Sequence, residues 1–304
     1  MEIGRARAVG LSLLWLATIP FAFAQNEIDN PAQIDTPDEL REAETNPGAI
    51  SSDDLARDLN NPNAPLAKLT IEYTRTTFEG DIPGADDESA DLVLFKPVFP
   101  FPLNDDGTRN LFVRPVFAYA ASQPLFDPDD GDFDSASGFG DLGYDVALGQ
   151  SYDSGLIMIG GIQGTIPIGS DELSSDQYRL GPEFIVAHIN ESRVLAAFPA
   201  HQWDISGDGP DYSVTTLELF ALKFLAGGWT VGTQPVISYD WEDSQATVPL
   251  NLTVRKVIRL ADMPMQVSVG FDYFIEKDDD FGQEYAFTLN LTPIVPNFIY
   301  QMLN

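Results

Sequence analysis

The chain has no cysteine, only two histidines and few basic residues. Without cysteine there is no disulfide framework, no thiolate metal site and no catalytic thiol. Lys and Arg together number 16 against 47 Asp and Glu, which gives a net charge of −31. Phosphate binding depends on clustered cations, so this balance excludes nucleic acid as a partner. His188 and His201 alone remain for metal binding or acid–base chemistry.

Long apolar runs are also absent after the N-terminus. No later segment offers the roughly 18 consecutive apolar residues that a membrane helix needs. Residues 1–24 read as a secretory signal peptide, because Arg5 and Arg7 precede an apolar run that ends in the A-x-A motif at 22–24. An uncleaved membrane anchor is the alternative. The shortness of the run and its small final residues favour cleavage before Gln25.

Residues 25–66 form an acidic segment that differs from the rest of the chain. They hold ten acids, no aromatic residue, and Arg41 and Arg57 as their only cations. Such a segment buries too little apolar surface to offset the entropy of ordering. Within it, Ser52 can cap a short helix over 52–59, and Asn61-Pro62 ends that helix. The sequence therefore predicts a disordered acidic tether with one short helix.

From residue 67 to 304 the hydrophobic period is two. Val267, Val269, Phe271 and Tyr273, for example, alternate with polar or small residues. Alternate side chains of a strand point to opposite faces, so each such segment has one apolar side. The inside–outside parity of 193–204 and 213–225 stays open. The predicted strands are 68–78, 90–101, 110–120, 138–149, 155–168, 177–188, 193–204, 213–225, 228–240, 246–258, 264–276 and 281–293.

Two architectures fit these strands: a soluble β-sandwich and a membrane barrel. The predicted strands exceed the usual five or six residues and suit a tilted crossing of a bilayer. Their number is even, and closure removes unpaired edges. These features favour an all-β, transmembrane, antiparallel up-and-down β-barrel of about twelve strands. Aromatic residues near strand ends are candidates for the interfacial girdles: Tyr119, Trp203, Trp229, Tyr239, Trp241 and Tyr273.

The charges in the connections give an independent check. If both ends of the barrel chain are periplasmic, the outward connections hold 20 acids and a single cation, Lys277. The inward connections are generally shorter and hold five acids. Long outer loops and short periplasmic turns are typical of bacterial barrels. The predicted location is therefore the outer membrane of a Gram-negative bacterium, with membrane lipid, lipopolysaccharide and the barrel-assembly machinery as partners.

The chain resembles the outer-membrane barrel family of the phenol-degradation meta-pathway, whose members are also labelled transporter or neuromedin U. Two stretches depart from the family pattern, Asn251–Val254 and 296–304. The resemblance implies an outer-membrane, transport-like role without naming a substrate. The matching stretches, in family order, are Asp54–Pro62, Lys96–Asn104, Gly138–Leu142, Leu180–Pro182, His201–Trp203 with Gly207–Asp208, Gly228–Glu242, and Thr247–Leu250 with Lys256–Val257.

Parity places eight charged side chains in the lumen. They form either a mixed-charge constriction that selects solutes or a set of pairs that plugs a small barrel. Lys96 and Arg114, each followed by proline on neighbouring strands, are expected to form a cationic patch. The candidates are Lys96, Arg114, Arg179, Glu183, Glu218, Arg255, Asp272 and Glu284.

A calcium loop is a weak alternative at residues 130–141. Asp130, Asp132, Asp134 and Asp141 follow its spacing in part, but Ser135 stands where glycine is needed. A diffuse acidic rim that gathers calcium or magnesium loosely fits the residues better. No tightly bound cofactor is predicted.

The sequence favours an outer-membrane channel or transporter, porin-like in form, for small molecules, including small hydrophobic or aromatic compounds. The alternative is a structural or surface-interaction barrel with a plugged lumen. An enzyme is not predicted. Outer-membrane phospholipases use an Asn–His–Ser set, and neither His188 nor His201 has a serine two positions on.

Overall fold

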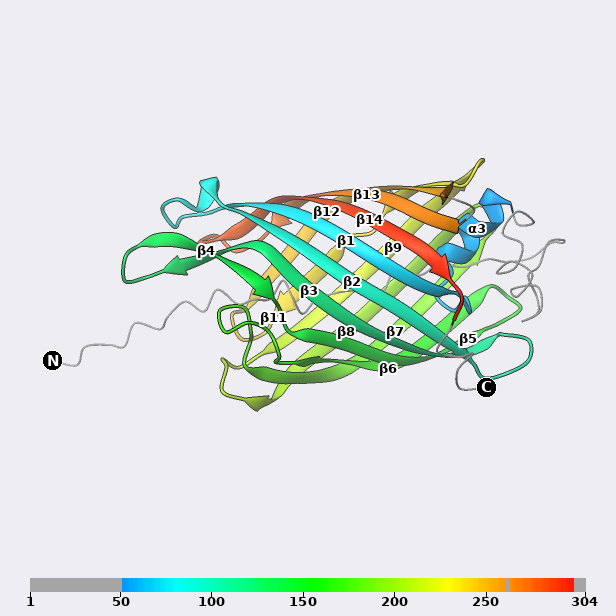
Figure 1. The fold of residues 1–304 in the computed structure, drawn as a ribbon, viewed down its shortest axis with the longest axis horizontal. Helices are drawn as coiled ribbons and strands as arrows, with labels where there is room; N and C mark the ends of the chain where they lie inside the picture. Colours follow the sequence, from blue (N-terminus) through cyan, green and yellow to red (C-terminus); the bar gives the residue numbers. More distant parts are fainter. Residues whose placement is uncertain (1–50, 261–262, 298–304) are drawn as a thin grey trace.

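The computed structural model describes residues 51–260 and 263–297, and Figure 1 shows them as a long, closed barrel. Helix α3 (Ser52–Leu59) precedes the first strand, and the short 3-10 helix η1 (Ala85–Asp87) lies in a loop. The strands are β1 (Ala67–Glu79), β2 (Ser89–Pro102), β3 (Arg109–Asp127), β4 (Asp132–Phe139), β5 (Leu142–Ser151), β6 (Leu156–Ile166), β7 (Gln177–Asn190), β8 (Arg193–Gly207), β9 (Ser213–Leu225), β10 (Trp229–Thr233), β11 (Val236–Asp240), β12 (Gln245–Leu260), β13 (Met263–Glu276) and β14 (Gly282–Val295).

The wall of the barrel closes where β1 pairs antiparallel with β14. β4 and β5 both pair with β3, and β10 and β11 both lie between β9 and β12, so each couple is one interrupted strand of the wall. Over the residues described, the wall therefore has twelve antiparallel strands. This confirms the predicted fold class. The second interruption falls at Gln234-Pro235, where proline has no N–H to offer to the ladder.

The outside of the barrel is apolar, as the period-two pattern predicts. On β13, Val269, Phe271 and Tyr273 are 40%, 48% and 45% exposed, whereas the alternate residues Gln266 and Ser268 are buried. An exposed apolar belt of this kind suits acyl chains and not water. No helix in the described part of the chain is long and apolar enough to cross a membrane.

The parity of β8 and β9 is clear in the structure. Val194 and Phe198 of β8 and Phe220 of β9 point inward and are buried, while Leu195 and Trp203 point outward. The sequence pattern is ambiguous here because both faces of these strands are apolar. The inward apolar residues join others into one cluster inside the wall: Val98, Phe112, Ala147, Ile157, Ile159, Ile185, Ala187, Ile189, Val194, Ala196, Phe198, Phe220 and Leu222.

The two ends of the barrel differ. The turns after β2, β5, β7 and β9 are short, and we call this the short-turn end; the opposite, long-loop end carries the protruding β3–β4 hairpin (Figure 1). The apolar cluster lies toward the short-turn end, because Ile157 begins β6, Ile189 ends β7 and Leu222 lies near the end of β9. Part of the lumen is thus filled by a packed apolar core. In that part the inward residues are apolar, whereas a water-filled lumen would have polar ones.

Helix α3 packs inside the short-turn end. Leu55, Ala56 and Leu59 are buried against the inward-facing Val257 of β12. Ser51, and not Ser52, caps the helix, because the Ser51 Oγ accepts a hydrogen bond from the Asp54 amide at 3.1 Å.

The short helix predicted within the acidic segment is therefore present at Ser52–Leu59. After the helix, Asn63 donates to the Thr108 carbonyl and to the Ser151 Oγ, both at 2.7 Å, which holds the chain against β3 and β5. The remainder of the predicted tether, 25–50, and the predicted signal peptide, 1–24, lie outside the described residues.

Candidate functional site

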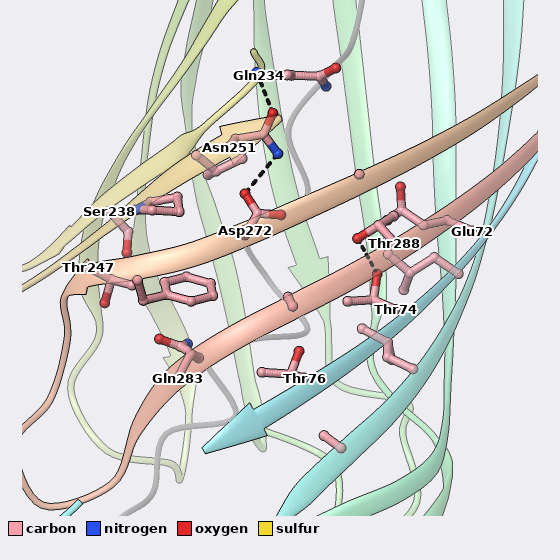
Figure 2. Close-up of a pocket in the computed structure, with 18 of the residues that line it drawn as sticks. Glu72, Thr74, Thr76, Gln234, Ser238, Thr247, Asn251, Asp272, Gln283 and Thr288 are labelled. Atoms are coloured by element: carbon pink, nitrogen blue, oxygen red, sulfur yellow. Dashed lines mark hydrogen bonds between the residues drawn. The ribbon is translucent and has the colours of Figure 1, made fainter. Parts of the chain in front are cut away.

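A cavity of about 710 Å³ lies beside the apolar cluster, on the side of the barrel formed by β1, β2 and β11–β14. Threonine and serine hydroxyl groups line much of the cavity. Some of them meet in pairs, because inward residues of neighbouring strands lie opposite one another. Thr74 and Thr288 hydrogen bond at 3.2 Å, and Thr70 and Thr292 at 3.1 Å. Figure 2 shows the Thr74–Thr288 pair pointing into this space. The wall of the cavity therefore combines uncharged polar side chains with apolar ones such as Leu92 and Leu94.

Four residues of this wall form a chain of hydrogen bonds that we call the amide relay: Glu218, Gln234, Asn251 and Asp272. The backbone N–H of Gln234 donates to the Asn251 Oδ1 at 2.7 Å, and the Asn251 Nδ2 donates to the Asp272 Oδ1 at 2.8 Å (Figure 2). The Gln234 Nε2 donates to the Glu218 Oε1. The relay lies at the interruption between β10 and β11, where the Asn251 side chain satisfies a backbone amide that the ladder leaves unpaired.

The cations of the cavity already have partners. Lys96 pairs with Glu72 at 2.9 Å, and Arg114 pairs with Asp145 at 2.7 Å. Arg255 donates to the side chains of Gln234 and Asn60. The expected cationic patch of Lys96 and Arg114 is therefore absent as a free positive surface: both residues line the cavity, but each is neutralised by a carboxylate.

Five of the eight predicted lumen charges line the cavity: Lys96, Arg114, Glu218, Arg255 and Asp272. Arg179 and Glu183 are buried on the inward face of β7, outside the cavity lining. Arg179 stacks 3.7 Å from the ring centroid of Tyr212, and burial raises the pKa of this loop tyrosine to about 12.

Glu284 lies elsewhere, because β14 has a bulge at this point. Thr77 pairs with Tyr285 and Phe78 pairs with Gln283, so Glu284 has no partner in β1. The bulge turns Gln283 into the cavity, and Glu284 accepts a hydrogen bond from the Tyr285 hydroxyl instead. A strict period of two cannot anticipate this shift.

The floor of the cavity is the C-terminal end of α3. Leu59 lines it, and the Leu59 carbonyl accepts a hydrogen bond from the Lys68 Nζ at 2.9 Å. Cations at a helix C-terminus are favoured by the helix dipole. At the other end of the helix, the Asp53 carboxylate accepts from the Gly228 amide. Burial raises the pKa of Asp58 to about 6, although Arg57 and Lys68 oppose the shift.

The mouth of the cavity, at the long-loop end, is aromatic. Phe78 and Phe281 stack with ring centroids 4.4 Å apart, and Phe133 of the β3–β4 hairpin packs 4.8 Å from Phe281. Asp278 and Asp280 line the same end. Neither these phenylalanines nor the amides of the relay are among the site residues predicted from the sequence. The available signal was Gln234, which directly precedes a proline inside a predicted strand.

The weak calcium candidates do not come together. Asp132 begins β4, whereas Asp141 lies past the end of that strand and is buried. The Asp141 carboxylate accepts hydrogen bonds from Gly169, Ser174 and Ser175, so it fixes the β6–β7 loop. Across the described residues, no group of three or more His, Cys, Asp or Glu side chains is arranged to hold a metal ion.

His201 lies on the outer wall with aromatic neighbours. Its Nδ1 lies 2.7 Å from the Thr215 Oγ1, and its ring lies 4.1 Å from that of Trp203. Trp241 donates to the same threonine hydroxyl at 2.8 Å. His201, Trp203 and Trp241 are therefore assigned to the aromatic girdle of the outer wall.

A closed wall, an apolar exterior and a polar internal cavity define a transmembrane β-barrel. Among solved structures, the chain is similar to an outer membrane channel from Pseudomonas putida F1, with 13% identity and a TM-score of 0.59 over 75% of this chain and 95% of that one. It is also similar to outer membrane phospholipase A from Escherichia coli, with 12% identity and a TM-score of 0.40 over 77% and 92% of the two chains. No family model and no curated protein matches the chain. The likeness to the channel concerns the fold. The resemblance to the phenol-degradation family stays a prediction.

Proposed function

We propose that the protein is an outer-membrane channel for small molecules, with small hydrophobic or aromatic compounds as the class of solute. One observation carries the proposal: the cavity follows the whole inward face of β1, from Lys68 at the floor to Phe78 at the mouth. Ten steps along a strand cover about 33 Å, and a tilt of about 45° reduces the span across the membrane to about 23 Å, which is most of the roughly 30 Å hydrocarbon core. Export by the signal peptide, assembly by the barrel-assembly machinery and contact with lipopolysaccharide belong to the same proposal.

Helix α3 closes this channel at the periplasmic side in our proposal. Its attachment rests on three small or medium apolar side chains, Leu55, Ala56 and Leu59, and on a few polar contacts. Burying one leucine contributes about 2 kcal/mol. The free energy needed to release the helix is therefore only a few times that value. Release of the helix would open the floor of the cavity.

Ion current across planar bilayers tests the channel. We expect the full-length chain to give small, infrequent current steps. Leu55→Asp places a charge in the buried face of α3 and should give larger and longer openings. Asp54→Asn is the matched control, because Asp54 contacts Ser51 and Arg57 on the partly exposed side of the same helix. Equal currents from the two variants would contradict the proposed closure.

The second candidate is a barrel that does not transport. The packed apolar cluster, which includes Phe112, Ile189 and Phe220, fills part of the lumen and favours this alternative. A complete lack of current from the Leu55→Asp variant would select it. We propose no enzymatic role, since His201 pairs with a threonine and two tryptophans surround the pair.

A further inference from the structure

We propose that the amide relay is a recognition site for an organic ammonium group carried on an aromatic or other apolar body. This inference rests on the proposed channel function and names a solute class for the cavity. It starts from Glu218, whose side chain is 1% exposed and lines the cavity. The Glu218 Oε1 accepts from Gln234, whereas the Oε2 has no hydrogen-bond partner. A buried carboxylate oxygen without a partner is costly, so the site favours a ligand that donates to it.

The cations around Glu218 act on its carboxylate through space, and none of those in the described part of the chain forms an ion pair with it. Lys96 and Arg114 are engaged by Glu72 and Asp145, and Arg255 donates to neutral amide side chains. In the described part of the chain, neither Glu218 nor Asp272 forms an ion pair. The relay therefore holds two carboxylates in one wall through neutral amides. A cation that enters the cavity would meet both.

The relay is better suited to an organic cation than to a metal ion. Calcium or magnesium needs several oxygen ligands around one point. Among residues 51–260 and 263–297, no group of three or more His, Cys, Asp or Glu side chains is arranged to hold a metal ion. An ammonium group needs only two or three acceptors. The Asn251 and Gln234 amides hold one oxygen of each carboxylate, which fixes the carboxylates in position.

The apolar body has a place next to the relay. Asp272 and Phe274 are alternate inward residues of β13, and both line the cavity. Two residues of strand span about 7 Å, which is roughly the reach from an ammonium to a ring on a two-carbon linker. Phe78 and Phe281 continue the aromatic surface toward the mouth. Aromatic faces attract cations as well, so the path to the relay suits the same ligand.

The acidic long-loop end complements this site. Asp240, Asp243, Asp278 and Asp280 line the outer part of the cavity, and their field raises the local concentration of cations. At the floor, Lys68 and Arg255 oppose further passage of a cation while α3 is docked. Four acids thus lie at the mouth, Lys68 lies at the floor, and Arg255 links the floor to the relay through Asn60 and Gln234.

Isothermal titration of the purified full-length protein in a neutral detergent at pH 7 tests the inference. The probes are phenethylammonium, the anion phenylacetate and the neutral 2-phenylethanol. We expect phenethylammonium to bind at least tenfold more tightly than either of the others. Preference for phenylacetate, or equal affinity for all three probes, would overturn the inference without the need for any variant.

Variants then locate the site. Glu218→Gln and Asp272→Asn should each weaken phenethylammonium binding at least tenfold, while the control Glu284→Gln, at the β14 bulge, should bind like the wild type. If one variant fails to fold, judged by the heat-dependent gel shift of barrels, the other still decides. Unchanged binding in a folded Glu218→Gln or Asp272→Asn protein overturns the assignment.

The two proposals fail in different ways. Bilayer current that persists without any preference for the ammonium probe leaves the channel intact and removes this inference. Ammonium binding without current, even in the Leu55→Asp variant, leaves the site and removes the channel.

Discussion

Single side chains inside the barrel differ greatly in what they contribute. Arg114 donates from both Nε and a terminal nitrogen to the Asp145 Oδ2, at 2.7 Å each, with side-chain exposures of 5% and 4%. Arg75 and Asp91 form a pair of the same length on the outer surface, where Arg75 is 51% exposed. Water screens the second pair and hardly reaches the first, so equal geometry carries unequal energy.

Removing the carboxylate from each pair measures that difference. We expect Asp145→Asn to destabilise the folded barrel by about 3–5 kcal/mol, because it removes the buried carboxylate that two nitrogens of the Arg114 guanidinium contact. Asp91→Asn should cost no more than about 1 kcal/mol. Urea unfolding in lipid vesicles, followed by tryptophan fluorescence, gives both values. Equal losses would mean that the interior around Arg114 is as wet as the surface.

The residue scale also shows where the sequence is an incomplete guide. Five of the eight predicted lumen charges line the cavity, since parity alone places them there. Glu284 does not, because one bulge near Phe78 breaks the alternation. The pairing of Lys96 with Glu72 depends on which strands are neighbours and on their register. A single sequence does not contain that information in any local pattern.

At the scale of elements, the strands follow from the sequence and the plug does not. Twelve segments with a period of two give twelve strands of the wall, because backbone groups in a bilayer must pair with one another. The helix over 52–59 is also where the capping pattern places it. Its position inside the barrel depends on contacts with Val257 and Lys68, far along the chain. The composition of the acidic segment predicts disorder, because the residues that hold the helix in place lie elsewhere in the sequence.

The docking of α3 should depend on pH through Asp58. Burial raises the pKa of Asp58 from 3.8 to about 6, so the docked helix binds a proton more tightly than the released one. Docking is therefore strongest below pH 4 and weakens as the pH rises through 6, by about 2 kcal/mol for a half-buried group.

Bilayer recordings between pH 4.5 and 7.5 check this expectation. The open fraction of the wild type should rise with pH across that range. Asp58→Asn removes the titrating group and should stay mostly closed at every pH, with Asp54→Asn as the control that keeps the wild-type profile. A pH dependence that survives in Asp58→Asn would assign it to other groups.

The whole molecule combines two kinds of interior within one wall. The apolar cluster around Phe112 and Ile189 is a dry core, and the cavity along β1 is a polar passage beside it. The channel is therefore off-centre. Its walls are β1, β2 and the strands from β11 to β14, its mouth is aromatic and acidic, and its floor is a helix held by cations. The sequence predicts a lumen lined by polar side chains throughout. In the structure, inward apolar residues of β6–β9 fill one side of that lumen.

Cysteine labelling tests this division directly, because the native chain has no cysteine of its own. Single cysteine replacements at Thr74 and Thr288 place a thiol in the cavity. Replacements at Val269 and Leu291 place a thiol on the outer apolar belt, and a replacement at Ile189 places one in the apolar cluster. A charged, membrane-impermeant thiol reagent is added to vesicles that contain the folded protein. The account predicts rapid reaction at Thr74→Cys and Thr288→Cys and protection at the other three positions. Reaction at Val269→Cys or Leu291→Cys with protection of the cavity positions would contradict a water-filled passage inside a lipid-facing wall.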